Sequence, residues 1–371
     1  MPRSPLDLAA PGVREINPYQ PGKPIDELER EYGISNSIKL ASNENPLGPG
    51  ANVLAAIAKA APQTALYPDG NGFHLKEALA AHHDVGVERI TLGNGSNDVL
   101  VLLAEAFLTP NHEAIYSEFA FAVYPLAVQA VGATAKVSAA QPGDSFSPLG
   151  HDLGAMETLI GDKTRLIFIA NPNNPTGTWI KSRELRDFLG QAPDHVLVVV
   201  DEAYFDYLEE QDYPDTSRWL DDFPNLVVTR TFSKAYGLAG LRIGYSLSHP
   251  DVANVLNRIR QPFNVNALAL EAACAAMKDQ AHLQRSVALN NEQRDVVAAG
   301  LKELGLRFVP SVANFILVDM DRPAMPVYED LLRQGVIIRP VGNYGLPEHL
   351  RISIGTAEQN QRLLQALRQV L

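Results

Sequence analysis

The chain of 371 residues has almost no cysteine, since Cys274 carries its one thiol. A single cysteine forms no internal disulfide and provides no thiolate cluster for a structural zinc, so we expect a reducing compartment. None of the nine histidines falls into an HExxH or other recognised metal-ligand spacing. We therefore expect no metal in the site.

Long apolar runs and basic clusters are missing as well. Nowhere do about 20 apolar residues run together as a membrane span requires, and the N-terminus has no apolar segment of signal-peptide length. The 31 basic and 43 acidic residues give a net charge of -12, which disfavours nucleic acid and anionic membranes as partners. A composition of 46% hydrophobic and 20% charged residues is typical of a folded globular protein. We expect a cytoplasmic protein.

The order of patterns predicts an α/β fold with two domains. Proline and glycine are dense over residues 1–50, which indicates an extended arm. Expected strands alternate with helical patterns after it, and this alternation is typical of a mainly parallel sheet covered by helices on both faces. The expected strands of this sheet are 89–93, 114–118, 164–171, 195–204 and 225–233.

The C-terminal third has a different pattern. Residues 251–304 read as helical, and strand-like runs then precede a closing helix at 358–370. This order predicts a smaller α+β domain. We place the N-terminal arm and part of the small domain at 1–45, the large domain at 46–285 and the small C-terminal domain at 286–371.

Unusual polar residues follow four expected strands, where ligands of open α/β sheets bind. They are the GNGS turn at 93–96, the NPNNPTG segment at 171–177, Asp201, and Lys234 in the segment 230–245. The GNGS turn alone is better explained as an ordinary strand-to-helix connection, and Asp201 alone equally fits a turn cap. In the NPNNPTG segment two asparagines are each followed closely by proline, and this restricts the backbone more than an ordinary connection requires.

Together these residues suit one ligand. A phosphate suits the amides near Ser96, the hydroxyl of Ser233 and the guanidinium of Arg242. A cationic ring nitrogen suits Asp201, and an aldehyde suits the amine of Lys234. Pyridoxal phosphate carries all three groups, so we predict that it is the cofactor.

At these residues the chain resembles a known family. The segments GNGSND, NPNNPTG, DEAYFDY, TFSKAYGLAGLRIGY and RISIG occur in the order found in the fold type I pyridoxal phosphate aminotransferases, and among them in the histidinol-phosphate aminotransferases. The resemblance covers nearly the whole chain. It implies a homodimer with sites at its interface, and a transaminase of histidine biosynthesis that interconverts histidinol phosphate and 2-oxoglutarate with imidazole acetol phosphate and glutamate.

The resemblance also implies roles for single residues in cofactor binding. Lys234 forms the Schiff base, Asp201 pairs with the pyridine nitrogen, and Asn174 and Tyr204 bind the phenolic oxygen. The residues implied to hold the phosphate are Ser96, Asn97, Ser233 and Arg242, together with Tyr67 of the other subunit.

Three further residues are implied to bind the substrate, beside Asn174. Arg351 matches the arginine that meets a carboxylate, Arg339 matches a second arginine that meets the substrate phosphate, and Tyr19 matches a tyrosine that closes over the substrate. A surface arginine and an arm anchor remain alternative interpretations of Arg339 and Tyr19.

The chain departs from the family pattern at FAFAVY, residues 119–124. Phe121 takes the place of the tyrosine that stacks on the cofactor ring, so stacking is kept and a phenol is lost. A core phenylalanine on the following helix is the alternative. An aromatic amino acid aminotransferase is therefore the second hypothesis for the function, followed by a decarboxylase on the same fold or a cofactor binder without turnover.

Overall fold

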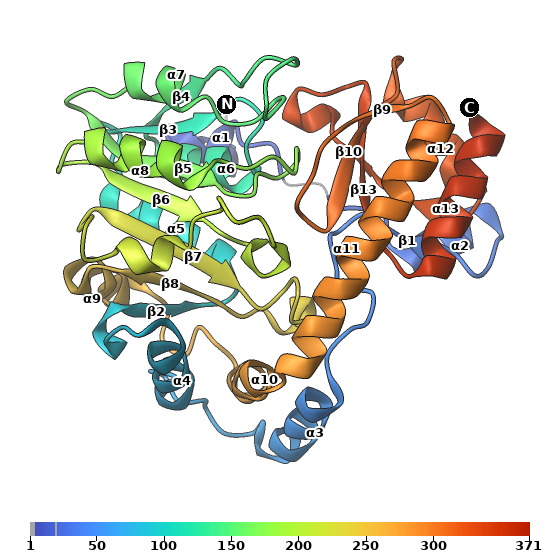
Figure 1. The fold of residues 1–371 in the computed structure, drawn as a ribbon. Helices are drawn as coiled ribbons and strands as arrows, with labels where there is room; N and C mark the ends of the chain where they lie inside the picture. The colour runs from blue at the N-terminus through green and yellow to red at the C-terminus, as the bar shows by residue number, and fades with distance from the viewer. Residues whose placement is uncertain (1–3, 19–20) are drawn as a thin grey trace.

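A computed structural model describes residues 4–18 and 21–371 of the chain, so Tyr19 lies outside the described residues. In the described part, a seven-stranded sheet and a four-stranded sheet form two lobes side by side (Figure 1). No helix in these ranges is long and apolar enough to cross a membrane.

The large sheet has the strand order β2-β8-β7-β6-β5-β3-β4. All its neighbouring strands are parallel except β8, which runs antiparallel to both β7 and β2. The prediction of a mainly parallel sheet is therefore confirmed. Its strands are β2 (Ile90–Gly93), β3 (Glu113–Ser117), β4 (Thr134–Ser138), β5 (Thr164–Ala170), β6 (Leu197–Asp201), β7 (Leu226–Thr231) and β8 (Gly244–Ser248).

Helices cover both faces of this sheet because its central strands are apolar on both sides. In β5, Ile167 and Ile169 pack with one group of helices, while Leu166 and Phe168 pack with the other. The first group contains α3 (Ala51–Ala60), α4 (Phe73–His83), α7 (Leu153–Thr158), α8 (Ser182–Gln191) and α10 (Ala267–Lys278). The second contains α5 (Ser96–Phe107), α6 (Val123–Ala130) and α9 (Pro250–Ile259).

The small sheet has the order β12-β13-β10-β9, with all neighbours antiparallel. Leu350 and Ile352 of β13 pack into the core of this lobe, whereas Arg351 and Ser353 lie on the opposite face of the strand. On that opposite face, Phe315 of β10 packs with Tyr204 of the large lobe. The strands are β9 (Arg307–Val309), β10 (Phe315–Asp319), β12 (Arg339–Pro340) and β13 (His349–Ser353), and the helices are α11 (Gln280–Glu303), α12 (Ala324–Arg333) and α13 (Ala357–Val370).

The N-terminal segment is less extended than its proline content predicts. It contains α1 (Pro11–Arg14) and the two-turn helix α2 (Ile25–Tyr32), so the expectation of an extended arm is wrong at these residues. Leu28 of α2 is fully buried against Leu332 and Ile337 of the small lobe, and this contact explains the helix. Further on, β1 (Ile38–Lys39) pairs in parallel with β11 (Val336–Ile337).

The longest helix, α11, connects the lobes (Figure 1). It begins beside α10, and its C-terminal part packs Val297 and Leu301 into the small-lobe core. The proposed domain boundary at residues 285–286 falls within this helix, and the division of the chain into 1–45, 46–285 and 286–371 stays a prediction.

Candidate active site

A cavity of about 280 Å³ lies where the carboxyl ends of the large-sheet strands face the small lobe. Eleven of the thirteen predicted site residues line it. They are Ser96, Asn97, Phe121, Asn174, Asp201, Tyr204, Ser233, Lys234, Arg242, Arg339 and Arg351.

Lys234 lies three residues after the end of β7 and is half-buried. Its Nζ atom is 3.3 Å from the carbonyl oxygen of Ser42 and 5.7 Å from the ring centre of Tyr204. Burial lowers the pKa of this amine to about 8, and the nearby charge of Arg351 acts in the same direction. About a tenth of the amine is therefore neutral, and hence nucleophilic, at pH 7, far more than at an ordinary lysine.

Asp201 is the last residue of β6, and its carboxylate is buried. The hydroxyl of Tyr124 on α6 donates to its Oδ2 atom at 2.8 Å, and that of Thr229 on β7 donates to its Oδ1 atom at 2.9 Å. Burial raises the pKa of the Asp201 carboxyl, and the two hydrogen bonds oppose that shift. A cation placed beside Asp201 is the partner that keeps such a buried carboxylate ionised.

Two neutral polar side chains complete the wall around Lys234. Tyr204 precedes the short 3-10 helix Phe205–Tyr207, and its hydroxyl accepts a hydrogen bond from Asn43 Nδ2 at 2.9 Å. Burial raises the pKa of Tyr204 to about 12, so the phenol keeps its proton. Asn174 is buried in the turn after β5, where its Oδ1 atom accepts a hydrogen bond from Arg351.

One end of the cavity is built to receive an anion. Gly95 has a φ of +85°, and the backbone then enters α5 at Ser96, whose helix N-terminus favours negative charge. A Cβ atom on Gly95 would lie 2.6 Å from Nη2 of Arg242, so glycine is needed for the guanidinium to fit. Arg242 itself has a φ of +58°, a strained conformation that is common at functional sites.

Two arginines enter the other end from the small lobe. Arg339 of β12 and Arg351 of β13 are direct partners across the two strands, and both are more than 90% buried. Guanidinium groups bind carboxylates and phosphates through paired hydrogen bonds, so two arginines at this end of the cavity suit an anionic substrate. Tyr344, which also lines the cavity, was not predicted.

Phe121 lines the cavity and is half-buried, and α6 begins two residues after it. It contacts Tyr124 edge to face, with ring centres 5.9 Å apart. Tyr124 was not predicted as a site residue, although FAFAVY places a second aromatic residue three positions after Phe121.

Tyr67 does not line the cavity of its own chain. It is 83% exposed and stacks on Phe263, with ring centres 4.7 Å apart. A role in the site of another subunit stays a prediction, and so does the role of Tyr19, which lies outside the described residues.

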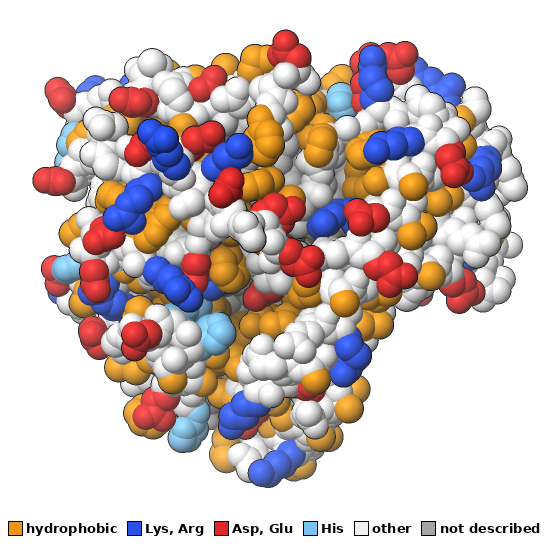
Figure 2. All heavy atoms as spheres, in the orientation of Figure 1, with side chains coloured by type: hydrophobic (Ala, Val, Ile, Leu, Met, Phe, Trp, Pro, Cys, Tyr) orange, Lys and Arg blue, Asp and Glu red, His pale blue; other side chains and the backbone are white. Residues whose placement is uncertain are grey.

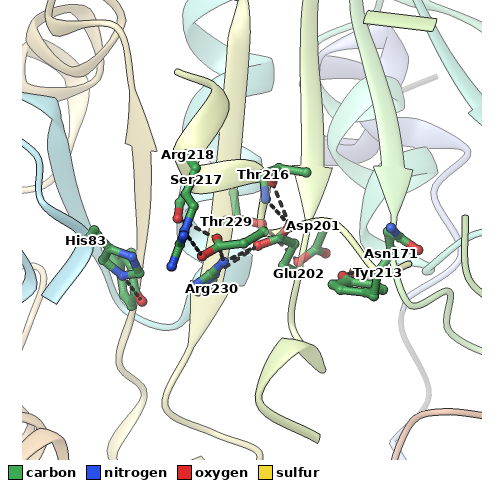
Figure 3. Close-up of polar contacts among 12 residues, drawn as sticks. His83, Asn171, Asp201, Glu202, Tyr213, Thr216, Ser217, Arg218, Thr229 and Arg230 are labelled. Carbon is green, nitrogen blue, oxygen red and sulfur yellow. Dashed lines mark hydrogen bonds and ion pairs between the residues drawn. The ribbon is translucent and has the colours of Figure 1, made fainter. Parts of the chain in front are cut away.

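A buried ion pair lies next to Asp201 on the other face of the sheet. Arg230 of β7 is 2.7 Å from Oε2 of Glu202, and the hydroxyl of Thr216 donates to the other carboxylate oxygen at 2.6 Å. Figure 3 shows these contacts beside Asp201. Glu202 directly follows Asp201 at the end of β6, and Arg230 directly follows Thr229 in β7. The ion pair therefore joins β6 and β7 at the place where Thr229 donates its hydrogen bond to Asp201. Sequence analysis did not predict this pair.

The chain matches known proteins over nearly its whole length. The family model "Aminotransferase class I and II" matches residues 35–367. The chain is 56% identical over 368 residues to histidinol-phosphate aminotransferase 2 of Pseudomonas fluorescens strain Pf0-1, covering 99% of this chain and 98% of that relative. It is 55% identical over 364 residues to histidinol-phosphate aminotransferase 2 of Methylococcus capsulatus, covering 98% of both.

A solved structure is similar over nearly the same length. The crystal structure of histidinol-phosphate aminotransferase from Sinorhizobium meliloti in complex with pyridoxal-5'-phosphate has a TM-score of 0.88 and 29% sequence identity, covering 97% of this chain and 96% of that one. The predicted fold class is thus confirmed, and this chain belongs to the class I and II aminotransferase family.

Proposed function

We propose that the protein transfers an amino group between histidinol phosphate and 2-oxoglutarate in histidine biosynthesis, with pyridoxal phosphate as cofactor. The observation that carries the proposal is one cavity in which Lys234 and Asp201 lie at the strand ends and Arg339 and Arg351 enter from the small lobe. The names of the relatives that match the chain over its full length support the substrate assignment.

The residues present fit the cofactor. Asp201 is a buried carboxylate that a ring N–H⁺ group would neutralise. The guanidinium of Arg242 lies beside Gly95, close to the N-terminus of α5, and these two groups together suit an anion. We assign the phosphate to Ser96, Asn97, Ser233 and Arg242, and the phenolic oxygen to Asn174 and Tyr204. Phe121 is assigned to the ring face.

When bound, pyridoxal phosphate supplies an aldehyde that bonds covalently to amines and a ring that accepts electrons. Lys234 provides the amine that holds it, and the same Nζ atom, once free and neutral, accepts and returns the substrate's Cα proton. Asp201 keeps the ring nitrogen protonated by stabilising its positive charge.

Arg339 and Arg351 account for two substrates in one site. Histidinol phosphate brings a phosphate, and 2-oxoglutarate brings two carboxylates. Guanidinium groups bind both kinds of anion through paired hydrogen bonds. We assign the substrate phosphate to Arg339 and a carboxylate to Arg351, with Tyr19 closing over the substrate.

We also propose that the enzyme works as a homodimer whose sites lie at the interface. Leu66 and Tyr67 are 70% and 83% exposed, and Phe73 at the start of α4 and Phe263 are exposed near them. Apolar side chains gather at the lower end of the molecule in Figure 2, where α3, α4 and α10 lie. A partner covering this face would bury these residues and bring its Tyr67 to the phosphate end.

The free Cys274 agrees with a cytoplasmic location.

Steady-state assays with a panel of amino donors test the function. We expect histidinol phosphate to give the highest kcat/KM, and parallel double-reciprocal lines when both substrates are varied, since both visit one site in turn. Phe121, an apolar ring at the cavity wall, is the observation that favours an aromatic amino acid as donor. A more than tenfold preference for phenylalanine would replace the proposal with that function, and an unchanged cofactor spectrum after addition of every donor would refute both.

A further inference from the structure

Asn43 lies beside the cavity and is tied to residues far away in the chain. Its side-chain nitrogen Nδ2 donates to the hydroxyl oxygen of Tyr204 at 2.9 Å. Asn43 is 1% exposed and Tyr204 is 4% exposed, so the contact is shielded from water. A buried hydrogen bond of this kind is costly to lose or to reverse.

The direction of this bond decides where the proton of Tyr204 goes. A phenol has one O–H donor and accepts through its oxygen. Because the oxygen of Tyr204 already accepts from Asn43, its own proton is free for a different acceptor. Tyr204 lines the cavity, and burial keeps its pKa well above neutral, so the phenol presents a donor to a ligand held there.

Asn43 is held in this orientation by the small lobe. The hydroxyl of Ser353 on β13 donates to Oδ1 of Asn43 at 2.8 Å, and the backbone N–H of Asn43 donates to the same hydroxyl oxygen at 2.8 Å. With its Oδ1 atom facing Ser353, the side chain of Asn43 turns its NH₂ group toward Tyr204. The backbone of Asn43 has a φ of +53°, a left-handed conformation that asparagine adopts more readily than most residues.

We propose that Asn43 is a positioning residue that, held by Ser353, makes Tyr204 a hydrogen-bond donor to the phenolic oxygen of the cofactor. The inference rests on the proposed cofactor site. Ser353 and Arg351 lie on the same face of β13. Ser353 donates a hydrogen bond to the side-chain oxygen of Asn43, and Arg351 donates one to the side-chain oxygen of Asn174, so each fixes the orientation of one amide. One strand of the small lobe thus sets the direction of both hydrogen bonds to that oxygen.

The pH titration of the visible absorbance of the cofactor bound to the purified enzyme tests the proposal. Loss of a donated hydrogen bond leaves the phenolic oxygen more negative, which favours the protonated form of the chromophore. We expect Tyr204→Phe to raise the titration midpoint by about one pH unit. Asn43→Asp supplies a carboxylate that accepts the proton of Tyr204, so it should raise the midpoint by a similar amount.

The double variant separates this mechanism from the added charge. If Asn43 acts through the hydroxyl, the shift caused by Asn43→Asp falls to less than half in the Tyr204→Phe background. An equal shift in both backgrounds, or no shift from Asn43→Asp, would overturn the proposal. The control Asn290→Asp makes the same change at a buried asparagine that bonds the carbonyl of Ala313, and it should leave the midpoint unchanged.

A milder variant covers the case in which Asn43→Asp does not fold. Ser353→Ala removes the hydrogen-bond donor to Oδ1 of Asn43. It should raise the titration midpoint by a smaller amount in the protein that keeps Tyr204, and it should not change the midpoint of Tyr204→Phe. No shift from Ser353→Ala would then refute the proposal. The wild-type enzyme distinguishes the two levels of inference, because the absence of a lysine-bound chromophore would refute the proposed function itself.

Discussion

Arg351 donates a hydrogen bond from Nη1 to Oδ1 of Asn174 at 2.5 Å and thereby joins β13 of the small lobe to the turn after β5. Its Nη2 atom donates to the carbonyl of Ala41 at 2.8 Å. The amide oxygen of Asn174 is thus occupied, and its NH₂ group is left to donate into the cavity. Arg351 thus orders a side chain that we propose binds the cofactor, while its own positive charge remains available to an anion.

The first prediction concerns Arg351. Arg351→Ala should lower kcat/KM for 2-oxoglutarate on the order of a hundredfold or more, because losing one partner of a buried charged pair costs about 3 kcal/mol. Histidinol phosphate has no carboxylate, so its kcat/KM should fall less. Single-turnover kinetics of the two half reactions measure both effects, and Arg307→Ala, at an exposed arginine of the edge strand β9, is the control. Equal losses for the two substrates would contradict a carboxylate role.

Asp201 provides the second prediction. Asp201→Asn removes the negative charge and places an amide where both Tyr124 and Thr229 donate hydrogen bonds, so one of the two hydroxyls loses its acceptor. We expect kcat to fall at least about a hundredfold, as when other charge-stabilising groups are removed from active sites. Asp152→Asn is the matched control, because Asp152 caps α7 and asparagine caps helices equally well. A kcat within about threefold of the wild type would refute the role of Asp201.

The strand ends of the large sheet are the part of the site that local sequence patterns predict well. Apolar runs identify β5, β6 and β7, and the polar residues that follow them necessarily meet at one edge because the strands are parallel. Strand β4 escaped prediction because it lies at the sheet edge with mostly exposed side chains and has no apolar run. Strand β8 escaped because it follows the glycine-rich loop that contains Arg242.

Contacts between distant segments are the part that local patterns do not predict. Asn43 and Ser353 are 310 positions apart, and only the packing of the N-terminal segment against β13 brings them together. The pairing of β1 with β11 has the same cause. A buried ion pair such as Glu202 and Arg230 is equally invisible, because the sequence does not reveal which charged residues share one face of a sheet.

A third prediction follows from the lowered pKa of Lys234. The folded pKa of about 8 lies below the ordinary value of 10.5, so the unfolded chain binds more protons between these two values. The free energy of unfolding of the cofactor-free protein should therefore rise with pH across this window through Lys234. At pH 7 the buried charge is a cost, and Lys234→Met should raise the free energy of unfolding by roughly 1–3 kcal/mol.

Urea unfolding of the cofactor-free wild type and of Lys234→Met, at pH 7 and at pH 10, measures this difference. Other groups titrate in the same range, so the relevant quantity is the change in the difference between the two proteins, which should shrink as the pH rises. Lys59→Met, at an exposed position of α3, should show no such pH dependence. A difference that stays constant with pH would show that Lys234 titrates normally in the folded protein.

The fourth prediction tests whether Tyr67 acts on the site of the partner subunit. Tyr67→Ala should weaken cofactor binding, and Lys234→Ala should abolish turnover. In a hybrid of the two variants, one site combines the intact Lys234 of the first subunit with the intact Tyr67 of the second. Mixing the two proteins under conditions that allow subunit exchange should therefore restore activity, up to about half of the wild-type value per hybrid dimer.

This recovery depends on geometry that the single chain already shows. Tyr67 does not line the cavity of its own subunit and stacks on Phe263 at an exposed surface, so we expect it to act on a different subunit. If Tyr67 served its own subunit, every hybrid site would carry a defect, and mixing would restore nothing. Phe146→Ala, at an exposed aromatic residue in a different part of the large lobe, provides the control, since it should neither reduce activity nor change the recovery.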